Sequence, residues 1–319
     1  MPETNLRFAI IGCGRIAQRH AEQINHFGYL KAVSDINASR ADELAAKYNA
    51  KAYYTTASLL LQDQEIDIVV ICTPNGLHAI HTIEALNAGF HVLCEKPMAI
   101  KVADCLHMID AAAVNKKQLF VVKQNRFNPP VQAVKTLLEQ NKLGKIYSVQ
   151  LNCYWNRNEA YYKDSWKGTK ALDGGTLFTQ FSHFIDIMYW VFGDIKDIQA
   201  KFDDFTHKHN TAFEDSGFVN FRFNNGGMGC INYSTAVWDT NMESSITVVG
   251  SKGSLKIGGQ YMNEVEYCHI ENYKMPQLDP VSPANDYGAY KGSAANHHFI
   301  IENVIDTLKG RTSITTNAL

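Results

Sequence analysis

The stretch Phe8-Ala-Ile-Ile-Gly-Cys-Gly-Arg-Ile-Ala17 decides the fold of the first part of the chain. A short apolar strand leads into a glycine turn, and a helical stretch then extends to about Gly28. Gly12 permits a tight turn, Gly14 lets the backbone approach a pyrophosphate, and Ala17 lets the helix pack on the strand. The stretch therefore predicts a dinucleotide-binding unit with the phosphate at the helix N-terminus.

An acidic residue follows the next strand, at the distance that a dinucleotide site requires. The strand Leu30 to Val33 ends at Ser34-Asp35, and Asp35 lies 23 positions after Gly12. A carboxylate accepts hydrogen bonds from ribose hydroxyls and repels a 2′-phosphate. Ile36 and Asn37 come next, with no adjacent arginine to neutralise such a phosphate. The sequence therefore favours NAD over NADP as the cofactor.

Strands and helices continue to alternate as far as Gln124. The expected elements are strand Ile66–Cys72, helix Leu77–Asn87, strand His91–Cys94, helix Val102–Asn115 and strand Leu119–Val122. This order predicts a doubly wound parallel sheet, in which ligands lie outside the carboxyl ends of the strands. The residues at these ends should share one crevice: Gly12, Asp35, Thr73, Asn75, Glu95 and Gln124. Lys96 would then lie beside the cofactor.

A different pattern follows Gln124. After helix Val131–Gln140, runs with strand character occur at Ile146–Trp155, Ile198–Phe202, Gly217–Phe223, Met228–Ser234, Ile246–Val249 and Val265–Ile270. Because regular helices do not separate them, we expect an open, mostly antiparallel sheet in an α+β domain. The predicted organisation is an NAD-binding domain at residues 1–124, a substrate and oligomerisation domain at 125–294, and a segment at 295–319. A helix at Ala295–Lys309 would return to the first domain.

Composition limits the class of partner. The 319 residues are 45% hydrophobic and 19% charged, enough for two buried cores, and the net charge is −2. No basic field is available for nucleic acid or an anionic membrane, and no apolar run approaches the roughly 18 residues of a membrane span. The seven scattered cysteines predict reduced thiols in a cytoplasmic protein. His207-Lys-His209 and His297-His298 lack metal-site spacing, so we expect no metal and a small-molecule partner.

The stretch Thr176–Val191 is predicted to be one helix with a polar stripe. At about 100° per residue, Thr179, Ser182, His183 and Asp186 share an arc on an otherwise apolar surface. In one interpretation His183 and Asp186 only satisfy each other or nearby backbone. In the other, the stripe lines a substrate pocket, and His183 takes the proton of an alcohol as hydride leaves.

Charged residues at two other places are candidates for chemistry. Lys96, at a strand end, is either solvated or lies beside the cofactor and orients a hydroxyl. Glu95 is either a contact of the ribose or the salt-bridge partner of Lys96. Three cations, Arg157, Lys163 and Lys167, surround Tyr161-Tyr162 and Trp166. They either bind an anionic substrate or form a solvated charged loop.

Several motifs together resemble the glucose-fructose oxidoreductase and inositol dehydrogenase (Gfo/Idh/MocA) family. They are Gly12-Cys-Gly-Arg-Ile-Ala17, Thr73-Pro-Asn75 with His78, Glu95-Lys-Pro97, and Gly174-Gly175 followed by His183, in matching order over nearly the whole chain. The resemblance implies a Rossmann domain plus an open-faced sheet domain. It also implies that Lys96 and His183 act on a sugar or cyclitol hydroxyl, and that the Lys96 to Pro97 peptide is often cis in relatives.

The resemblance completes the set of expected site residues. The NAD contacts are Gly12, Gly14, Arg15, Ile16, Asp35, Thr73, Asn75, His78, Glu95, Lys96, Gln124 and Trp166. The catalytic residues are Lys96 and His183, and the substrate contacts are Arg157, Lys163, Lys167, Thr179 and His183. Many relatives have aspartate where this chain has Thr179, and many continue beyond Leu319 into another helix.

Within the family, Tyr161–Thr169 and Asp173–Asp186 are most similar to bacterial UDP-N-acetyl-2-amino-2-deoxyglucuronate dehydrogenases. The resemblance implies NAD-dependent oxidation of the C3 hydroxyl of a UDP-linked N-acetylglucosaminuronate in making surface polysaccharide, with 2-oxoglutarate as a possible hydride acceptor. It also implies a homodimer or homotetramer formed through the open sheet. The alternatives are a free sugar or myo-inositol dehydrogenase, an NAD-dependent glycoside hydrolase, and an NAD-binding redox sensor without turnover.

Overall fold

The computed structural model describes residues 6–288, 290–316 and 318, which form two compact units. The first unit contains the chain up to Lys123, the short segment Ala171–Asp173, and the chain from His297 onward. The second unit contains Gln124–Lys170 and Gly174–Asn296. The segment Ala171–Asp173 thus belongs to the first unit, although both of its sequence neighbours belong to the second.

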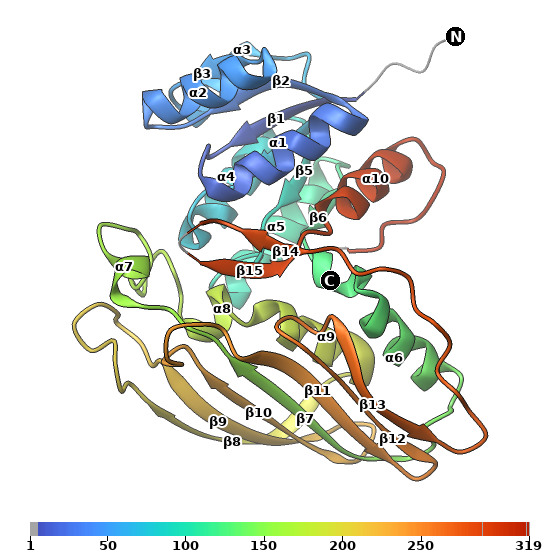
Figure 1. The fold of residues 1–319 in the computed structure, drawn as a ribbon. Helices are drawn as coiled ribbons and strands as arrows, with labels where there is room; N and C mark the ends of the chain where they lie inside the picture. The colour runs from blue at the N-terminus through green and yellow to red at the C-terminus, as the bar shows by residue number, and fades with distance from the viewer. Residues whose placement is uncertain (1–5, 289, 317, 319) are drawn as a thin grey trace. The chain divides into compact units, whose positions relative to one another are not determined.

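The first unit is built on a parallel sheet of six strands in the order β3-β2-β1-β4-β5-β6 (Figure 1). Its strands are β1 Arg7–Ile11, β2 Tyr29–Ser34, β3 Lys51–Tyr53, β4 Ile68–Ile71, β5 His91–Cys94 and β6 Leu119–Val121. The order reverses at β1, because β1 pairs with both β2 and β4. All four residues of β4 are buried, as expected for a parallel strand covered on both faces. The predicted doubly wound sheet is confirmed.

Helices join the strands of this sheet. They are α1 Arg15–Phe27, α2 Ala38–Tyr48, α3 Thr56–Gln62, the 3-10 turn η1 Asn75–Leu77, α4 His78–Asn87, α5 Val102–Val114 and α10 His297–Leu308. Between Asn37 and Gln62, where no element was expected, the structure has α2, β3 and α3. Helix α10 packs against α1, from the opposite end of the chain.

The second unit contains a seven-stranded sheet in the order β13-β12-β11-β7-β10-β9-β8. Its strands are β7 Ile146–Tyr154, β8 Ile195–Asp203, β9 Ser216–Phe223, β10 Met228–Ser234, β11 Glu243–Gly250, β12 Gly253–Gly258 and β13 Glu264–Ile270. Five of its pairings are antiparallel, and β7 with β10 is parallel. The mostly antiparallel sheet is confirmed, with β12 as an additional strand that pairs with both β11 and β13.

Helices cover one face of this sheet and leave the other uncovered (Figure 1). The helical elements of the second unit are η2 Gln124–Phe127, α6 Pro129–Glu139, α7 Glu159–Tyr162, α8 Thr176–Thr179 and α9 Ser182–Phe192. Its core joins α6 and α9 to the inner faces of the strands, for example through Val134, Phe184 and Leu151. A small hairpin, β14 Ala284–Asp286 with β15 Lys291–Ala294, completes the unit.

The prediction of one continuous helix over Thr176–Val191 is wrong, because the chain breaks between α8 and α9 at Gln180 and Phe181. Phe181 leaves the helical region, with φ −112° and ψ 3°. Its ring is fully buried and packs edge-on against Trp155, with ring centroids 5.5 Å apart. This contact interrupts the helix, so Thr179 does not lie on the same helical surface as His183 and Asp186.

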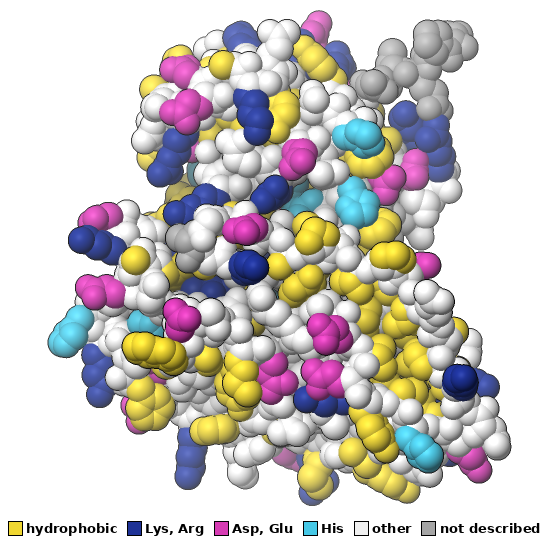
Figure 2. Space-filling view, in the orientation of Figure 1, with side chains coloured by type: hydrophobic (Ala, Val, Ile, Leu, Met, Phe, Trp, Pro, Cys, Tyr) yellow, Lys and Arg dark blue, Asp and Glu magenta, His cyan; other side chains and the backbone are white. Residues whose placement is uncertain are grey.

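The distribution of surface charge and the state of the cysteines agree with what the composition predicts. On the face drawn in Figure 2, positive and negative side chains are interspersed over the described surface. Within the described residues, no helix is both long and apolar enough to cross a bilayer. All seven cysteines are free thiols, and four of them are buried: Cys13, Cys72, Cys94 and Cys153.

Candidate functional site

The turn between β1 and α1 has the space that a pyrophosphate needs. Gly12 adopts φ +92°, and a Cβ there would lie 2.7 Å from the carbonyl carbon of Cys72. A Cβ on Gly14, by contrast, would meet nothing within 4 Å. Gly14 caps α1, whose first turn begins with Arg15 and Ile16 and contains no acidic residue. Open space at a helix N-terminus whose first turn carries no acidic residue fits a bound phosphate group.

Asp35 lies against the same turn. Its Oδ2 accepts a hydrogen bond from the backbone N–H of Cys13 at 2.7 Å, and its Oδ1 accepts one from Asn37 at 2.8 Å. The carboxylate is partly exposed at the end of β2. The structure therefore brings Asp35 and the glycine turn together as predicted, in an arrangement that fits the adenosine ribose and pyrophosphate of NAD.

The residues after β4 brace the neighbouring turns. Asn75 is buried and its side chain donates to the carbonyl of Asp173 at 2.8 Å, which holds the segment Ala171–Asp173 on the first unit. Both ring nitrogens of His78 contact backbone carbonyls, that of Pro97 at 2.7 Å and that of Thr73 at 2.9 Å. His78 thus connects the turn after β4 to the turn that carries Lys96.

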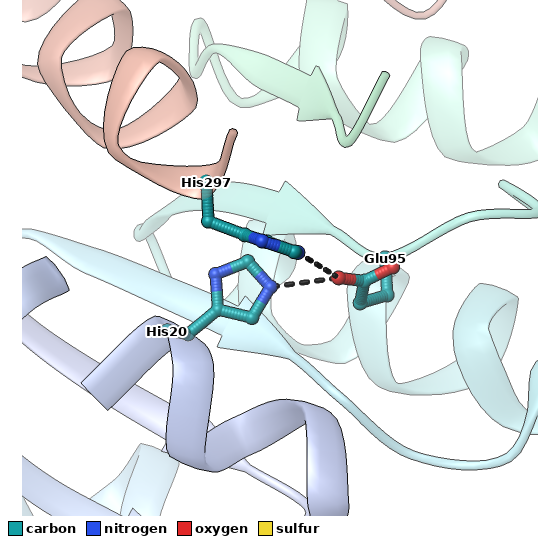
Figure 3. A group of neighbouring side chains, drawn as sticks. All are labelled: His20, Glu95 and His297. Atoms are coloured by element: carbon teal, nitrogen blue, oxygen red, sulfur yellow. Dashed lines mark hydrogen bonds and ion pairs between the residues drawn. The ribbon is translucent and has the colours of Figure 1, made fainter. Parts of the chain in front are cut away.

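Glu95, directly after β5, is the centre of a buried polar cluster (Figure 3). His20 Nε2 lies 2.8 Å from Glu95 Oε1, and His297 Nε2 lies 3.8 Å from the same oxygen. The other carboxylate oxygen, Oε2, accepts a hydrogen bond from the backbone N–H of Lys96 at 2.9 Å. Through Glu95, α1 and the start of α10 are connected to the turn at Lys96.

Burial and charge shift the pKa values in this cluster. Burial alone would raise the pKa of Glu95, but the hydrogen bond and the charge of His20, together with the Lys96 charge, lower it to about 2. Burial lowers the pKa of His297 to about 3, helped by the proximity of His20. Glu95 is therefore ionised and His297 neutral over the whole physiological range, so the cluster places a buried carboxylate beside Lys96.

These shifts predict a loss of stability in mild acid. Between pH 6.5 and 3 the unfolded chain binds a proton at His297 that the folded chain does not, so stability falls as the pH drops, by up to about 1.4 kcal/mol per pH unit. The contribution of Glu95 is present above pH 4.5 and is lost as the pH falls towards 2. Urea unfolding between pH 6.5 and 4.5 measures this loss without the contribution of Glu95. Burial also lowers the pKa of His78, His81 and His91, so His297→Gln should reduce the pH dependence without abolishing it.

His298→Gln is the matched control for this prediction, because His298 is the neighbouring histidine on α10 and is only partly buried. It should leave the pH dependence of the wild type in place. An equal slope for wild type and His297→Gln would show that position 297 does not take up the proton.

Lys96 is half-buried at this turn, and the peptide bond between Lys96 and Pro97 is cis. Its backbone N–H is held by Glu95, as described above. The turn follows the carboxyl end of β5, where the doubly wound topology places ligands.

In the second unit, η2 and α9 hold the predicted histidine. His183 is buried, and its Nε2 lies 3.3 Å from Nε2 of Gln124. Asp186, one turn further along α9, accepts two hydrogen bonds from Arg126, each of 2.7 Å. His183 and Asp186 thus each pair with a residue of η2, Gln124 and Arg126.

Arg157 lies inside the second unit and not on a solvated loop. Its side chain is 2% exposed, and its Nε donates to Oε1 of Gln180 at 2.8 Å. The guanidinium carbon lies 4.8 to 5.2 Å from the ring centroids of Trp155, Tyr161 and Tyr290. Burial lowers the pKa of Arg157, while the nearby tyrosines oppose this. Arg157 thereby joins the loop before α7 to the break between α8 and α9.

Of the remaining predicted substrate residues, Lys167 lies against the same tyrosine. Lys167 is half-buried, with Nζ 4.5 Å from the ring centroid of Tyr161 and 5.6 Å from that of Trp166. Lys163 is exposed, and Thr179 is half-buried at the end of α8. Lys167 and Arg157 thus place two positive charges on one group of aromatic rings.

The residues of these networks that were not among the predicted site residues include His20, His297, Arg126 and Gln180. His20 had a signal in the sequence, since it lies on the buried stripe of α1 with Ala17, Ala21 and Ile24. A histidine on an apolar stripe requires a buried polar partner. Arg126 and Gln180 had no such signal in the sequence, because their partners lie in distant parts of the chain.

The chain is similar to known oxidoreductases over its whole length. A family model for the NAD-binding Rossmann fold of GFO/IDH/MocA oxidoreductases matches residues 6–123, and a model of the C-terminal domain of that family matches residues 131–256. The WlbA dehydrogenase of Chromobacterium violaceum, solved with NADH and UDP-GlcNAcA, is 32% identical, with a TM-score of 0.87 over 100% of this chain and 90% of that one.

The chain is also similar to two further dehydrogenases. The WlbA dehydrogenase of Bordetella pertussis, also solved with NADH and UDP-GlcNAcA, is 31% identical with a TM-score of 0.87, over 98% of this chain and 91% of that one. The D-glucoside 3-dehydrogenase of Escherichia coli is 29% identical over 72% of this chain and 70% of its own length.

Proposed function

Because the chain belongs to the GFO/IDH/MocA family of NAD-dependent sugar oxidoreductases, we propose that it oxidises the C3 hydroxyl of a UDP-linked N-acetylglucosaminuronate. The observation that carries this choice of substrate is the full-length similarity to two dehydrogenases solved with NADH and UDP-GlcNAcA, both above 30% identity. The substrate carries a carboxylate and a diphosphate, which agrees with the paired cations Arg157 and Lys167 on the aromatic rings of the second unit.

The first unit binds the cofactor. Gly12 and Gly14 would hold the pyrophosphate at the N-terminus of α1, and Asp35 the ribose hydroxyls, while NAD supplies the hydride acceptor. We assign further contacts with NAD to Arg15, Ile16, Thr73, Asn75, His78, Glu95, Lys96, Gln124 and Trp166.

Two residues act on the hydroxyl group in this proposal. The Lys96 ammonium donates a hydrogen bond to the hydroxyl oxygen and favours the developing negative charge there. The imidazole of His183 takes the hydroxyl proton, which it can do near neutral pH. Glu95 holds the backbone of Lys96 through the hydrogen bond of 2.9 Å, so it acts as a positioning residue.

The test is a reaction of purified protein with UDP-N-acetylglucosaminuronate, NAD and 2-oxoglutarate. We expect a 3-oxo sugar, together with 2-hydroxyglutarate if the NADH is recycled in place. Absence of both products would reject this substrate. NAD reduction with a free glucoside or inositol instead would establish the second candidate, which the similarity to the D-glucoside 3-dehydrogenase favours. Release of a sugar from a glycoside without net formation of NADH would indicate that the protein is an NAD-dependent glycoside hydrolase.

We further propose that the uncovered sheet face joins two or four copies of the chain in the bacterial cytoplasm, where the nucleotide-linked sugar of surface polysaccharide is made. Large apolar side chains on this sheet are exposed: Ile198 by 58%, Phe218 by 59% and Tyr267 by 53%. Exposed apolar surface of this kind is typical of an interface. Sedimentation equilibrium of the protein tests the proposal, and a monomer at micromolar concentration would reject it.

A further inference from the structure

We propose that Gln124 is a positioning residue that holds His183 in the tautomer with an unprotonated Nε2, and so makes Nε2 the atom that receives the substrate proton. This inference rests on the proposed function of His183 and deepens it. The sequence placed Gln124 among the cofactor contacts, whereas the structure pairs its side chain with the predicted base.

The side chain of Gln124 uses both of its N–H groups within the second unit. Gln124 is 4% exposed, and its Nε2 lies 3.3 Å from His183 Nε2 and 3.3 Å from Ser293 Oγ. An amide nitrogen is a donor and never an acceptor. In this contact His183 Nε2 must therefore be the acceptor, and a neutral His183 carries its proton on Nδ1.

The opposite orientation of the amide group is disfavoured by the surroundings. In the orientation described, Oε1 of Gln124 is buried and has no hydrogen-bond partner among the described residues. Exchanging the oxygen and the nitrogen would leave two N–H groups at that position without acceptors. A buried donor without a partner is rarer in proteins than a buried carbonyl oxygen without one. The orientation in which Gln124 donates leaves fewer buried N–H groups without an acceptor, so hydrogen-bonding balance favours it.

Further contacts hold the elements that carry Gln124 and His183. The carbonyl of Gln124 accepts a hydrogen bond of 3.3 Å from Asn296, whose side chain also donates to Asn128 at 2.7 Å. The bidentate pair of Arg126 with Asp186 ties η2 to α9. These contacts hold the amide and the imidazole at their positions before any substrate arrives.

Charged and titratable groups lie on α9 and on the elements packed against it, η2, α6 and β7. Asp186 on α9 is neutralised by Arg126 on η2, and Lys135 on α6 donates to the carbonyl of Trp190 at the far end of α9. On β7, burial raises the pKa of Cys153 well above its ordinary value, so this thiol is neutral. The hydrogen bond of Gln124 acts on the imidazole directly. It stabilises the neutral imidazole, because a protonated Nε2 would face an amide N–H.

The proton transfer follows from this arrangement. The substrate hydroxyl replaces the amide of Gln124 at Nε2, its O–H bond breaks, and the proton forms the Nε2–H bond of an imidazolium. The electron pair left on oxygen forms the carbonyl bond as the hydride leaves carbon for the NAD acceptor. The hydrogen bond from Gln124 thus keeps the receiving nitrogen unprotonated until the hydroxyl arrives.

The test is NMR spectroscopy of the protein labelled with ¹⁵N in its 12 histidines, with His183 identified by its absence from His183→Asn. The nitrogen shifts report which ring nitrogen carries the proton, and no substrate is needed. For the wild type we expect His183 protonated at Nδ1, and a neutral His183 protonated at Nε2 would overturn the proposal. Ser293→Ala is the control and should keep the wild-type tautomer, since Gln124 still donates to His183.

Two substitutions of Gln124 give results that a merely structural role would not produce. In Gln124→Glu the side chain becomes a carboxylate that can only accept, so the proton should move to Nε2 and the titration midpoint of His183 should rise by at least one pH unit. Gln124→Met keeps the size of the side chain and removes the donor, so the preference for Nδ1 should weaken. A wild-type tautomer in folded Gln124→Glu would contradict the proposal.

The kinetic measurement separates this inference from the proposed function. With an active substrate, the acidic limb of kcat/KM in Gln124→Glu should move up by the same pH shift, and a shift of one unit lowers kcat/KM about fivefold at the wild-type midpoint. If the proposed substrate is wrong, turnover is absent in every variant while the NMR result stands. If only the inference is wrong, the wild type turns over but carries the proton on Nε2.

Discussion

Replacing His183 with alanine should lower kcat by roughly 10²- to 10⁴-fold, the range expected when a positioned general base is lost. Without the imidazole, the hydroxyl proton would have to pass to water, although position 183 is buried in the protein. The affinity for NAD should stay close to that of the wild type, because Gly12, Gly14 and Asp35 belong to the other unit. Steady-state kinetics and a fluorescence titration with NADH measure the two effects.

His209→Ala is the control for this prediction, since His209 is exposed on a loop of the same unit. It should leave kcat unchanged. If His183→Ala lost less than threefold in kcat while Lys96→Ala lost more than a hundredfold, Lys96 would be the base and His183 only a substrate contact.

Replacing Asp186 with leucine should lower the free energy of unfolding by about 3 kcal/mol, because it leaves the guanidinium of Arg126 without its partner. The two side chains are only 15% and 7% exposed, and they share two hydrogen bonds of 2.7 Å. Arg126 also lies over the ring of Trp190, 5.2 Å from its centroid, so it has little freedom to reach water. Urea unfolding at pH 7 measures the loss.

The double variant Arg126→Met with Asp186→Leu separates the pair from its surroundings. A pair of apolar side chains of similar size should recover most of the stability, because no charge is then left buried alone. If Asp186→Leu alone cost less than 1 kcal/mol, the pair would behave as an exposed salt bridge and would not anchor α9 to η2.

The fold of the first unit could be predicted from sequence because its signals are local. Buried parallel strands are short apolar runs, and the helix that follows each of them has its own periodicity. The glycine turn needs φ +92° at Gly12, where a side chain would collide with Cys72, so the residue type itself indicates the geometry. The sheet of the second unit was predicted less completely, since alternation reveals strands but neither their order nor β12.

The site, like the fold, was predicted where its signals are local and was missed where they are not. Spacing alone placed Asp35 at the glycine turn, where its carboxylate accepts the N–H of Cys13. The partners of Glu95 could not be read from spacing, because His20 is 75 positions away and His297 comes from the last helix. The break at Gln180 also escaped prediction, as the helical pattern continues through it while Arg157 and Trp155 hold the residues in place.

The sequence by itself determined the doubly wound domain, its NAD site, the open sheet and the candidates Lys96 and His183. Each of these depends on residue types at short, regular spacing, which are the positions that local backbone geometry couples. Only the tertiary structure decided that Glu95 pairs with His20, that Arg126 takes Asp186, and that Gln124 faces His183. These contacts join residues about 60 to 75 positions apart, and a buried polar group accepts any partner that packing brings within hydrogen-bond distance.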